Sequence, residues 1–288
     1  MIPGVTPTAK SLTLDLLSTL PGSTMPVGAL VEAAALFGIQ ENALRVALAR
    51  LRAAGQVERD ERGRYRLGTA AQPIDRRVTS WRRAAERVRP WDGGWLGVHT
   101  AGLAPRPSER QLRRRGRALR FLGFETLVPG LALRPDNLRG GVASVREELH
   151  ALGLEAGALV FELGALDPAT EARARGLWDV AALCAGYRQS LADLAASERR
   201  LQVASEADAM VESFLLGGRV LRQLVLDPLL PEPVVPTAER DALVEAMRRY
   251  DRLGRACWAP FMERHGAVGR RAPADTRIPD GATRLAAG

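Results

Sequence analysis

The chain has 288 residues, a hydrophobic content of 46% and a formal charge of +8, from 41 basic and 33 acidic residues. This length and composition allow two or three domains with buried cores. The longest apolar stretches are far shorter than the roughly 20 residues that span a bilayer, so no transmembrane segment is expected. The positive charge favours a polyanionic partner such as nucleic acid, although a G+C-biased genome also produces an arginine-rich chain whose only lysine is Lys10.

The N-terminus and the cysteines point to an intracellular protein without a metal. Residues 1–10 lack the charged start, apolar middle and cleavage site of a secretory signal, so we expect the chain to stay in the cytoplasm. Cys184 and Cys257 are too few for a disulfide framework, and no histidine accompanies them at metal-ligand spacing. We predict reduced packing thiols, no metal site and no cofactor.

Residues 8–54 show the periodicity of three helices. Leucines at four-residue steps predict a first helix over residues 8–20, ended by Pro21 and Gly22. A second amphipathic helix begins after Pro26 and closes at Gly38, a residue that readily takes the left-handed conformation. The third is predicted over residues 40–54. Its inward stripe is Leu44, Ala47, Leu48 and Leu51, and its outer side carries small and polar residues.

A short β-hairpin is predicted directly after the third helix. Residues 56–59 and 64–67 alternate apolar and polar side chains around a charged turn that contains Gly63. Three helices followed by a hairpin are the element order of a winged helix-turn-helix domain, in which the third helix reads the major groove of duplex DNA. A small three-helix module for protein contacts, with solvated arginines, is the alternative.

The DNA-contacting residues are predicted from the outer face of the third helix and from the hairpin tip. Between residues 40 and 70 there are seven arginines and four acidic residues, a net charge of +3 (7 − 4). A helix can bring its side chains to the base edges of the major groove only if the face that enters the groove is narrow. Arginines beside this face are attracted to the phosphates of the DNA backbone. The predicted contacts are Gln40, Asn42, Arg45, Ala49, Arg50, Arg52, Arg62 and Arg64.

A linker helix is predicted over residues 71–90. Its apolar stripe is expected to dock on the protein through Trp81 and consists of Ile74, Val78, Trp81, Ala85 and Val88. Its other faces carry arginines that either contact DNA or are simply solvated: Arg76, Arg77, Arg82, Arg83, Arg87 and Arg89.

Residues 91–166 alternate strands and helices. Strands are predicted at 95–100, at 126–133 as one or two strands, and at 158–163, with helices at 108–122 and 142–152. This succession predicts a small ferredoxin-like α+β domain. The buried stripe of its first helix is predicted to be Leu112, Leu119 and Leu122, and the arginines of that helix are most simply a solvated face.

The remaining residues predict a helical C-terminal domain over 167–267 and a disordered tail over 268–288. Helices are expected at 169–198, 208–226 and 237–263. Aromatic residues are enriched here and are expected to form cores and dimer interfaces, with an aryl or adenine pocket as the alternative: Trp178, Tyr187, Phe214, Tyr250, Trp258 and Phe261.

The sequence offers no catalytic constellation. His99, His150 and His265 are dispersed, and neither a nucleophile elbow nor a phosphate-binding loop is present. Adjacent carboxylates such as Glu147 and Glu148 lie in a helical pattern, where neighbours point apart. We therefore expect a protein that is not an enzyme, with no catalytic residues.

Four ordered segments resemble the phenylacetate-degradation repressor family, PaaX. They are Ala43-Leu44-Arg45-Val46-Ala47-Leu48-Ala49-Arg50-Leu51; Trp91-Asp92-Gly93-Gly94-Trp95; Leu122-Gly123-Phe124 with Pro129-Gly130-Leu131; and Leu226-Asp227-Pro228 with Leu230-Pro231. The resemblance implies a homodimeric repressor of a catabolic operon, with a winged-helix N-terminus, a middle domain similar to the small CRISPR adaptation nuclease, and a helical C-terminus. It also implies release from operator DNA by an aryl-CoA or acyl-CoA effector, typically phenylacetyl-CoA, at a binding site that the sequence leaves unknown.

The chain departs from the family pattern at three places. Residues 97–101 lack the aspartate with which nuclease relatives hold a metal, so a metal-dependent nuclease is only the alternative reading. The wing is shorter and more acidic than the family leads us to expect. Val235-Pro236-Thr237 stands where the family has Trp-Pro-Gly, so the operator and the effector do not follow from the resemblance.

Together these observations predict an α+β, mostly helical chain. Its domains are expected at 1–70 (winged helix-turn-helix), 71–90 (linker), 91–166 (ferredoxin-like) and 167–267 (helical), followed by the tail.

Overall fold

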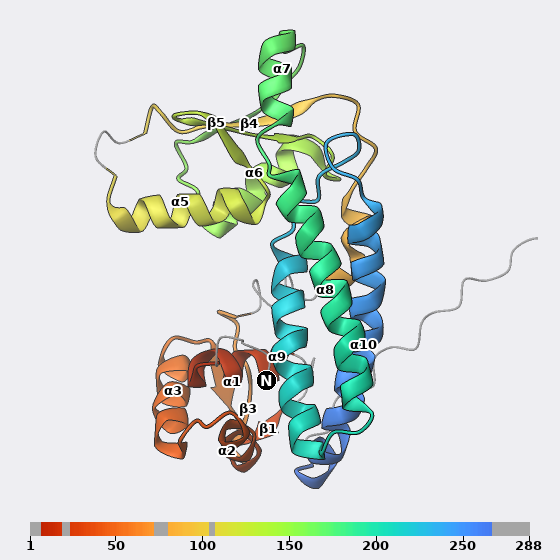
Figure 1. Cartoon of the computed structure of the whole chain (residues 1–288). Helices are drawn as coiled ribbons and strands as arrows, with labels where there is room; N and C mark the ends of the chain where they lie inside the picture. The colour runs from red at the N-terminus through yellow and green to blue at the C-terminus, as the bar shows by residue number, and fades with distance from the viewer. Residues whose placement is uncertain (1–6, 19–23, 72–79, 104–106, 267–288) are drawn as a thin grey trace, which may run out of the picture. The chain divides into compact units, whose positions relative to one another are not determined.

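A computed structural model of the chain describes residues 7–18, 24–71, 80–103 and 107–266 (Figure 1). These residues form two compact units. One contains residues 7–71 together with the chain from Pro260 onwards, and the other contains residues 72–259. The described structure is α+β and mostly helical, as the sequence predicts. Among the described residues, no helix combines the length and the apolar character needed to cross a membrane.

In the unit of residues 7–71, the described residues form three helices and three short strands. The helices are α1 (Ala9–Ser18), α2 (Val27–Leu36) and α3 (Glu41–Ala53). The strands β2 (Val57–Arg59) and β3 (Arg64–Leu67) form the expected hairpin. A two-residue strand, β1 (Met25–Pro26), pairs with the other side of β3 and had no signal in the sequence. The sheet order is β1-β3-β2.

Apolar side chains hold this unit together from all three helices. Leu12, Leu16 and Leu17 of α1 are buried, as are Leu44, Leu48 and Leu51 of α3. The inward stripe of α3 therefore matches the predicted leucines, whereas Ala47 is only partly buried. Gly38 takes the left-handed conformation (φ 71°) after α2, as expected for the residue that reverses the chain between two helices.

The end of the last helix belongs to the same unit. Helix α10 (Ala238–Arg264) contains Pro260, and the unit boundary falls between residues 259 and 260. His265 Nε2 lies 2.9 Å from Glu32 Oε2 of α2. The ring of Phe261, which is almost completely buried, lies with its centroid 4.6 Å from that of the His265 ring, and the two ring planes are tilted by 49°. The end of α10 is thus anchored beside α2 through residues 233 positions apart (265 − 32).

The linker differs from the predicted α-helix. Residues 72–79 lie outside the described residues, and residues 80–87 form a 3₁₀ helix, η1 (Ser80–Arg87), with a non-helical residue at Arg83. Trp81 is buried, and it packs in one cluster with α8 (Val180–Leu201), α9 (Glu206–Val225) and α10. This confirms the predicted docking of Trp81, whereas Ala85 of the same predicted stripe is exposed.

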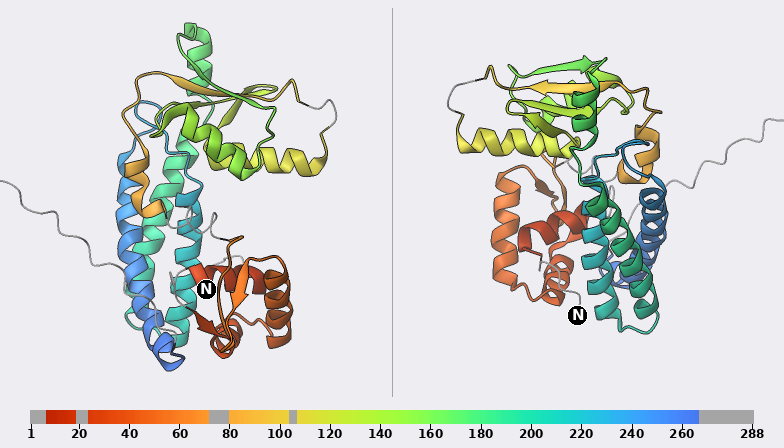
Figure 2. Two further views of the ribbon diagram at one scale, coloured as in Figure 1. Left: turned by 180° about the vertical axis from the view of Figure 1, so that it is seen from behind. Right: turned by 45° about the horizontal axis from the view of Figure 1, so that its top comes forward.

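Residues 95–163 form a four-stranded antiparallel sheet with two helices. The strands are β4 (Trp95–His99), β5 (Glu125–Val128), β6 (Leu131–Pro135) and β7 (Leu159–Leu163), in the order β5-β6-β4-β7. The predicted region 126–133 is therefore two strands, joined at Pro129 and Gly130. Helices α5 (Glu109–Phe121) and α6 (Gly141–Leu152) lie on one face of this sheet (Figure 2).

Alternation along β4 separates the two faces of the sheet. Leu96 and Val98 are buried under α5 and α6, whereas Trp95 points to the other face, where it stacks on Trp178 with ring centroids 6.3 Å apart. Helix α5 begins at a capping box, in which the Ser108 hydroxyl accepts from the Gln111 N–H. The predicted stripe of α5 is confirmed at Leu122, which is buried, and at Leu119, which is partly buried, but it is wrong at Leu112, which is 47% exposed. Ala118 completes the buried face.

The helical region is divided differently from the prediction. Residues 169–198 were expected to form one helix, but α7 (Pro168–Arg175) ends at Gly176 and α8 begins after Asp179. The Asp179 carboxylate accepts from the Ala182 N–H, so a local cap starts the second helix. Helices α8, α9 and α10 run alongside one another (Figure 1), and Tyr187 and Tyr250 are buried between them.

The loop between α9 and α10 is held by polar groups from distant elements. The Tyr187 hydroxyl donates to Asp227 Oδ2 at 2.5 Å, and Asp227 Oδ1 accepts from the Leu229 N–H. Asn137, at the end of β6, donates to the Leu229 carbonyl at 2.7 Å. Gly123 (φ 72°) lies so close that a Cβ there would be 2.7 Å from the Cα of Pro228. Two of the family-like segments, 122–124 and 226–231, therefore meet at this loop.

Candidate nucleic-acid interface

The outer face of α3 is exposed in full. Gln40 is the N-cap residue, and it is exposed together with the other predicted contacts on this helix: Asn42, Arg45, Ala49, Arg50 and Arg52. Val46 lies on the same side and is 43% exposed. The three leucines of α3 are buried on the opposite side, so the helix has the two faces that the sequence predicts. A helix of this kind fits a major groove, where short side chains let the backbone approach the base edges.

The arginines of α3 differ in their surroundings. Arg45 forms an ion pair with Glu41, one helical turn earlier, at 2.6 Å. Both side chains remain more than half exposed, so the pair is weak and a phosphate or a guanine can replace it. Arg50 and Arg52 make no ion pair with any described residue. The spacing of Glu41 and Arg45 was visible in the sequence as an i, i+4 pair.

The hairpin tip is organised by Asp60. Its Oδ1 accepts hydrogen bonds from the backbone N–H groups of Arg62 (3.0 Å) and Arg64 (2.7 Å). The carboxylate therefore folds the turn, and it leaves the Arg62 side chain exposed. The structural role of Asp60 explains why an acidic residue is present in a hairpin that is predicted to contact phosphates. At the base of the hairpin, Arg66 pairs with Glu58 across the two strands at 2.7 Å.

Arg64 is engaged within its own unit. Its Nε donates to the Thr24 hydroxyl at 2.6 Å, and its Nη2 donates to the backbone carbonyls of Thr24 (3.0 Å) and Gly266 (2.6 Å). Arg64 thus differs from Arg45, which pairs with Glu41 of its own helix, because its charged group is held by acceptors from distant parts of the chain. No local signal in the sequence links Arg64 to Gly266, because the two residues are 202 positions apart.

The linker arginines are largely used inside the other unit. Arg82 pairs with Asp251 at 2.7 Å, Arg87 lies 3.7 Å from Glu148, and Arg89 pairs with Asp136 at 2.7 Å. These contacts favour docking over DNA contact for the three residues. Arg83 is exposed, whereas Arg76 and Arg77 lie outside the described residues.

The comparisons with known proteins bear on this interface directly. Residues 8–71, which contain α1 to β3, match the family model of PaaX-like proteins. Over these residues, which are fewer than half of the chain, the chain is similar to the PaaX-like family. Because that family consists of transcriptional regulators, the match indicates a role in the control of transcription. The match covers the unit that carries α3 and the hairpin, which we call the PaaX-like domain.

A solved structure extends the likeness beyond the PaaX-like domain. The chain is similar to the uncharacterized protein Rv0674 from Mycobacterium tuberculosis, with a TM-score of 0.60 and 26% sequence identity. The alignment covers 88% of this chain and 99% of that one. A search of curated proteins found no match.

Proposed function

We propose that the chain is a transcriptional regulator that binds duplex operator DNA through its PaaX-like domain, a winged helix-turn-helix. The observation that carries this proposal is the exposed outer face of α3, with Arg45, Arg50 and Arg52 beside Asn42. Phosphates would be contacted by the arginines and by Arg62 of the hairpin, and bases by Asn42 and Arg45. The protein acts by binding rather than by catalysis.

The architecture proposed for this function has three domains and a linker. The strand order β5-β6-β4-β7, with α5 and α6 on one face, supports a ferredoxin-like middle domain over residues 91–166. Helices α7 to α10 support a helical domain, which we assign to residues 167–267, although the end of α10 from Pro260 groups with residues 7–71. We assign residues 1–70 to the winged helix and residues 71–90 to the linker, while the proposed tail at 268–288 lies outside the described residues.

The resemblance to the phenylacetate repressors extends the proposal to regulation. The chain acts in the cytoplasm as a homodimeric repressor of a catabolic operon, and an aryl-CoA or acyl-CoA thioester such as phenylacetyl-CoA releases it from DNA. A dimer requires a palindromic operator whose half-sites match its symmetry.

A gel-shift assay with DNA from upstream of the protein's own gene tests the proposal. We expect a shifted band that resists random competitor DNA and weakens steeply with salt, because phosphate contacts release counterions. Equal competition by random DNA would argue for the protein-contact alternative. Incubation with RNA and DNA plus Mg²⁺ or Mn²⁺ tests the nuclease alternative, and we expect no cleavage.

A further inference from the structure

One side of helix α5 is lined with exposed arginines, which we call the α5 stripe. Residues three, four and seven positions apart share a side of a helix, and this spacing joins five of the six arginines of α5. The members of the stripe are Arg110, Arg113, Arg114, Arg117 and Arg120, and all five are exposed. Ala118 and Leu119, on the opposite side, pack on the core under the sheet. The stripe extends over ten residue steps (120 − 110), about 15 Å along the helix axis.

The positive charges of the α5 stripe are largely uncompensated. Helix α5 contains six arginines and one acidic residue, Glu109. Glu109 pairs with Arg113 at 2.9 Å, but both side chains are more than two-thirds exposed, so water screens the pair. Arg115, which is not part of the stripe, is held by Glu155 at 2.8 Å. The other four arginines of the stripe form no ion pair or hydrogen bond with any described residue.

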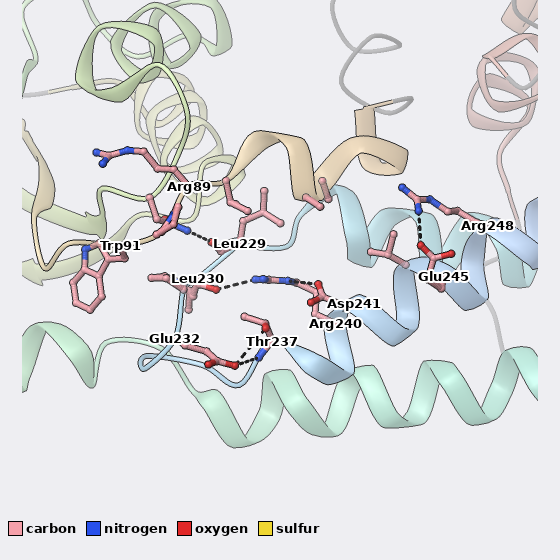
Figure 3. Close-up of a pocket in the computed structure, with 17 residues that line it drawn as sticks. Arg89, Trp91, Leu229, Leu230, Glu232, Thr237, Arg240, Asp241, Glu245 and Arg248 are labelled. Carbon is pink, nitrogen blue, oxygen red and sulfur yellow. Dashed lines mark hydrogen bonds and ion pairs between the residues drawn. The ribbon is translucent and has the colours of Figure 1, made fainter. Parts of the chain in front are cut away.

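The arginines of the C-terminal helices have different surroundings. Figure 3 shows two that lie beside a carboxylate, Arg248 with Glu245 and Arg240 with Asp241. The arginines of α7 to α10 that form ion pairs are Arg175, Arg188, Arg200, Arg219, Arg240, Arg248 and Arg255. A G+C-biased genome enriches arginine along the whole chain. It does not explain why acidic partners accompany the arginines of these helices and are missing from the α5 stripe.

The like charges of the α5 stripe repel one another. Positive side chains three or four residues apart, such as Arg110 and Arg114, oppose helix formation. Helix α5 forms nevertheless, because Ser108 caps its first turn and its apolar side packs on the core. A polyanion bound along the stripe would remove this repulsion, so the repulsion in the free protein favours binding.

The stripe fits the phosphates of duplex DNA. A duplex carries about one negative charge per 1.7 Å of its axis, twice the density of one strand, so a row of positive charges about 15 Å long meets several phosphates. Surfaces that bind single strands also present aromatic rings on which bases stack. The one aromatic residue of α5, Phe121, is partly buried. The stripe therefore offers charge for a phosphate backbone and no exposed ring for unpaired bases.

We propose that the α5 stripe is a second DNA-binding surface of the chain, which contacts the phosphates of duplex DNA without reading their sequence. This inference rests on the proposed DNA-binding function and adds a surface outside the PaaX-like domain. The stripe lies within the unit of residues 72–259, so its composition does not depend on where the PaaX-like domain is placed. Phosphate contacts raise the affinity for operator and for random DNA by the same factor, because they carry no sequence information.

Two triple variants with the same change in charge test the stripe. The stripe variant replaces three of its arginines by glutamine, which favours a helix about as well as arginine does. The control variant replaces three arginines of α8 and α10 that are also exposed and form no ion pair with a described residue. The substitutions are Arg110→Gln, Arg114→Gln and Arg117→Gln in the stripe variant, and Arg199→Gln, Arg249→Gln and Arg252→Gln in the control variant.

Fluorescence anisotropy of the full chain over a salt series measures the effect, on operator duplex and on random duplex of equal length. We expect the stripe variant to lower the slope of log affinity against log salt by about 2–3, because each lost phosphate contact removes about 0.9. Both duplexes should be bound about tenfold more weakly, with their affinity ratio unchanged. The control variant should keep the wild-type slope. An unchanged slope in the stripe variant, or an equal decrease in the control variant, overturns the proposal.

Lysine substitutions and thermal unfolding separate lost charge from lost structure. Lysine at the same three positions is expected to keep the wild-type slope, because a phosphate attracts either cation. The stripe variant should melt at the wild-type temperature or above it, because repulsion within α5 is reduced. If it melts lower, Arg117→Gln alone decides the question, with an expected decrease in slope of about 0.9. An unchanged slope in R117Q would then reject the surface.

Single-stranded DNA of the same sequence identifies the kind of nucleic acid. The loss of affinity in the stripe variant should be larger on the duplex, whose charge density is higher. A larger loss on the single strand would overturn the assignment to duplex DNA. Operator binding whose salt slope is the same in the stripe variant would reject this inference and leave the proposed function standing. Binding that depends on the stripe but does not distinguish operator from random DNA would keep the surface and reject the proposed regulator.

Discussion

Arg64 of β3 donates a hydrogen bond of 2.6 Å to the carbonyl of Gly266, directly after the last helix of the chain. The same guanidinium holds Thr24, in the segment that leads into β1. One side chain thus ties the hairpin, the start of the sheet and the end of α10 together. A residue that the sequence suggested for phosphate contact has a structural role in the unbound protein.

Arg64→Ala is therefore expected to destabilise the PaaX-like domain. Loss of three charge-assisted hydrogen bonds predicts a decrease of about 1–3 kcal/mol in the free energy of unfolding. Thermal unfolding measures this, with exposed Arg62→Ala as the control. If Arg64→Ala left the melting temperature unchanged but reduced the salt dependence of DNA binding, Arg64 would be a phosphate contact, as the sequence predicted.

Substitutions on α3 and at the hairpin tip should separate base reading from phosphate binding. Arg45→Ala and Asn42→Ala are expected to cost about 1–3 kcal/mol on operator DNA and less on random DNA, because base contacts carry the specificity. Arg62→Ala should weaken binding to both and lower the salt slope by about 1. Fluorescence anisotropy over a salt series measures both effects, with Arg199→Ala on α8 as the control. Equal losses on both DNAs for all three variants would contradict the assigned roles.

Gly123 should not tolerate a side chain. Gly123→Ala would place a methyl group 2.7 Å from Pro228 at a positive φ, so we expect a loss of more than about 2 kcal/mol in stability. Gly218→Ala on α9 is the matched control, because nothing lies within 4 Å of its Cβ and alanine favours a helix by about 0.5–1 kcal/mol. Chemical denaturation measures both. A stable G123A would show that the loop after α9 can move away.

The carboxyl group of Asp227 predicts a pH dependence. Burial raises its pKa above the ordinary value of 3.8, against the opposing effects of Tyr187 and Arg240. A raised pKa in the folded state contributes stability that is present below pH 3.8 and is lost as the pH rises through the folded-state value. The free energy of unfolding of the wild-type chain, compared with that of Asp227→Asn, should therefore decrease as the pH rises from 3.8 through the raised pKa of Asp227.

Denaturation of wild type and D227N between pH 4 and 8 measures this difference. Asp136 must be considered with it, because burial raises the pKa of that carboxyl as well and it is unchanged in the variant. Glu147→Gln, at an exposed site on α6, serves as the control. A stability difference between wild type and D227N that does not vary with pH would show that Asp227 titrates normally.

Most individual elements could be predicted from local patterns. Helix α3 was expected at residues 40–54 and is found at Glu41–Ala53, and the hairpin strands lie within one residue of their predicted positions. The errors occur where a local cap or a distant partner overrides periodicity. Asp179 starts a new helix inside a continuous helical pattern, and β1 exists only because β3 pairs with it.

Part of the candidate site could also be predicted from local sequence patterns. The outer face of α3 follows from the spacing of its leucines alone, because residues three and four apart share a side of a helix. The engagement of Arg64 depends on Gly266, which is 202 positions away in the chain. Contacts between residues so far apart in the chain leave no periodic signal.

The amino-acid sequence by itself determined the two faces of α3, the hairpin that follows it and the positive charge around them, since these depend on propensity and spacing over a few turns. Only the tertiary structure decided which arginines remain exposed, how the loop after α9 is held, and that the end of α10 packs beside α2. These features arise from packing between distant segments, where the partner that buries or neutralises a side chain is selected by the fold and not by its sequence neighbours.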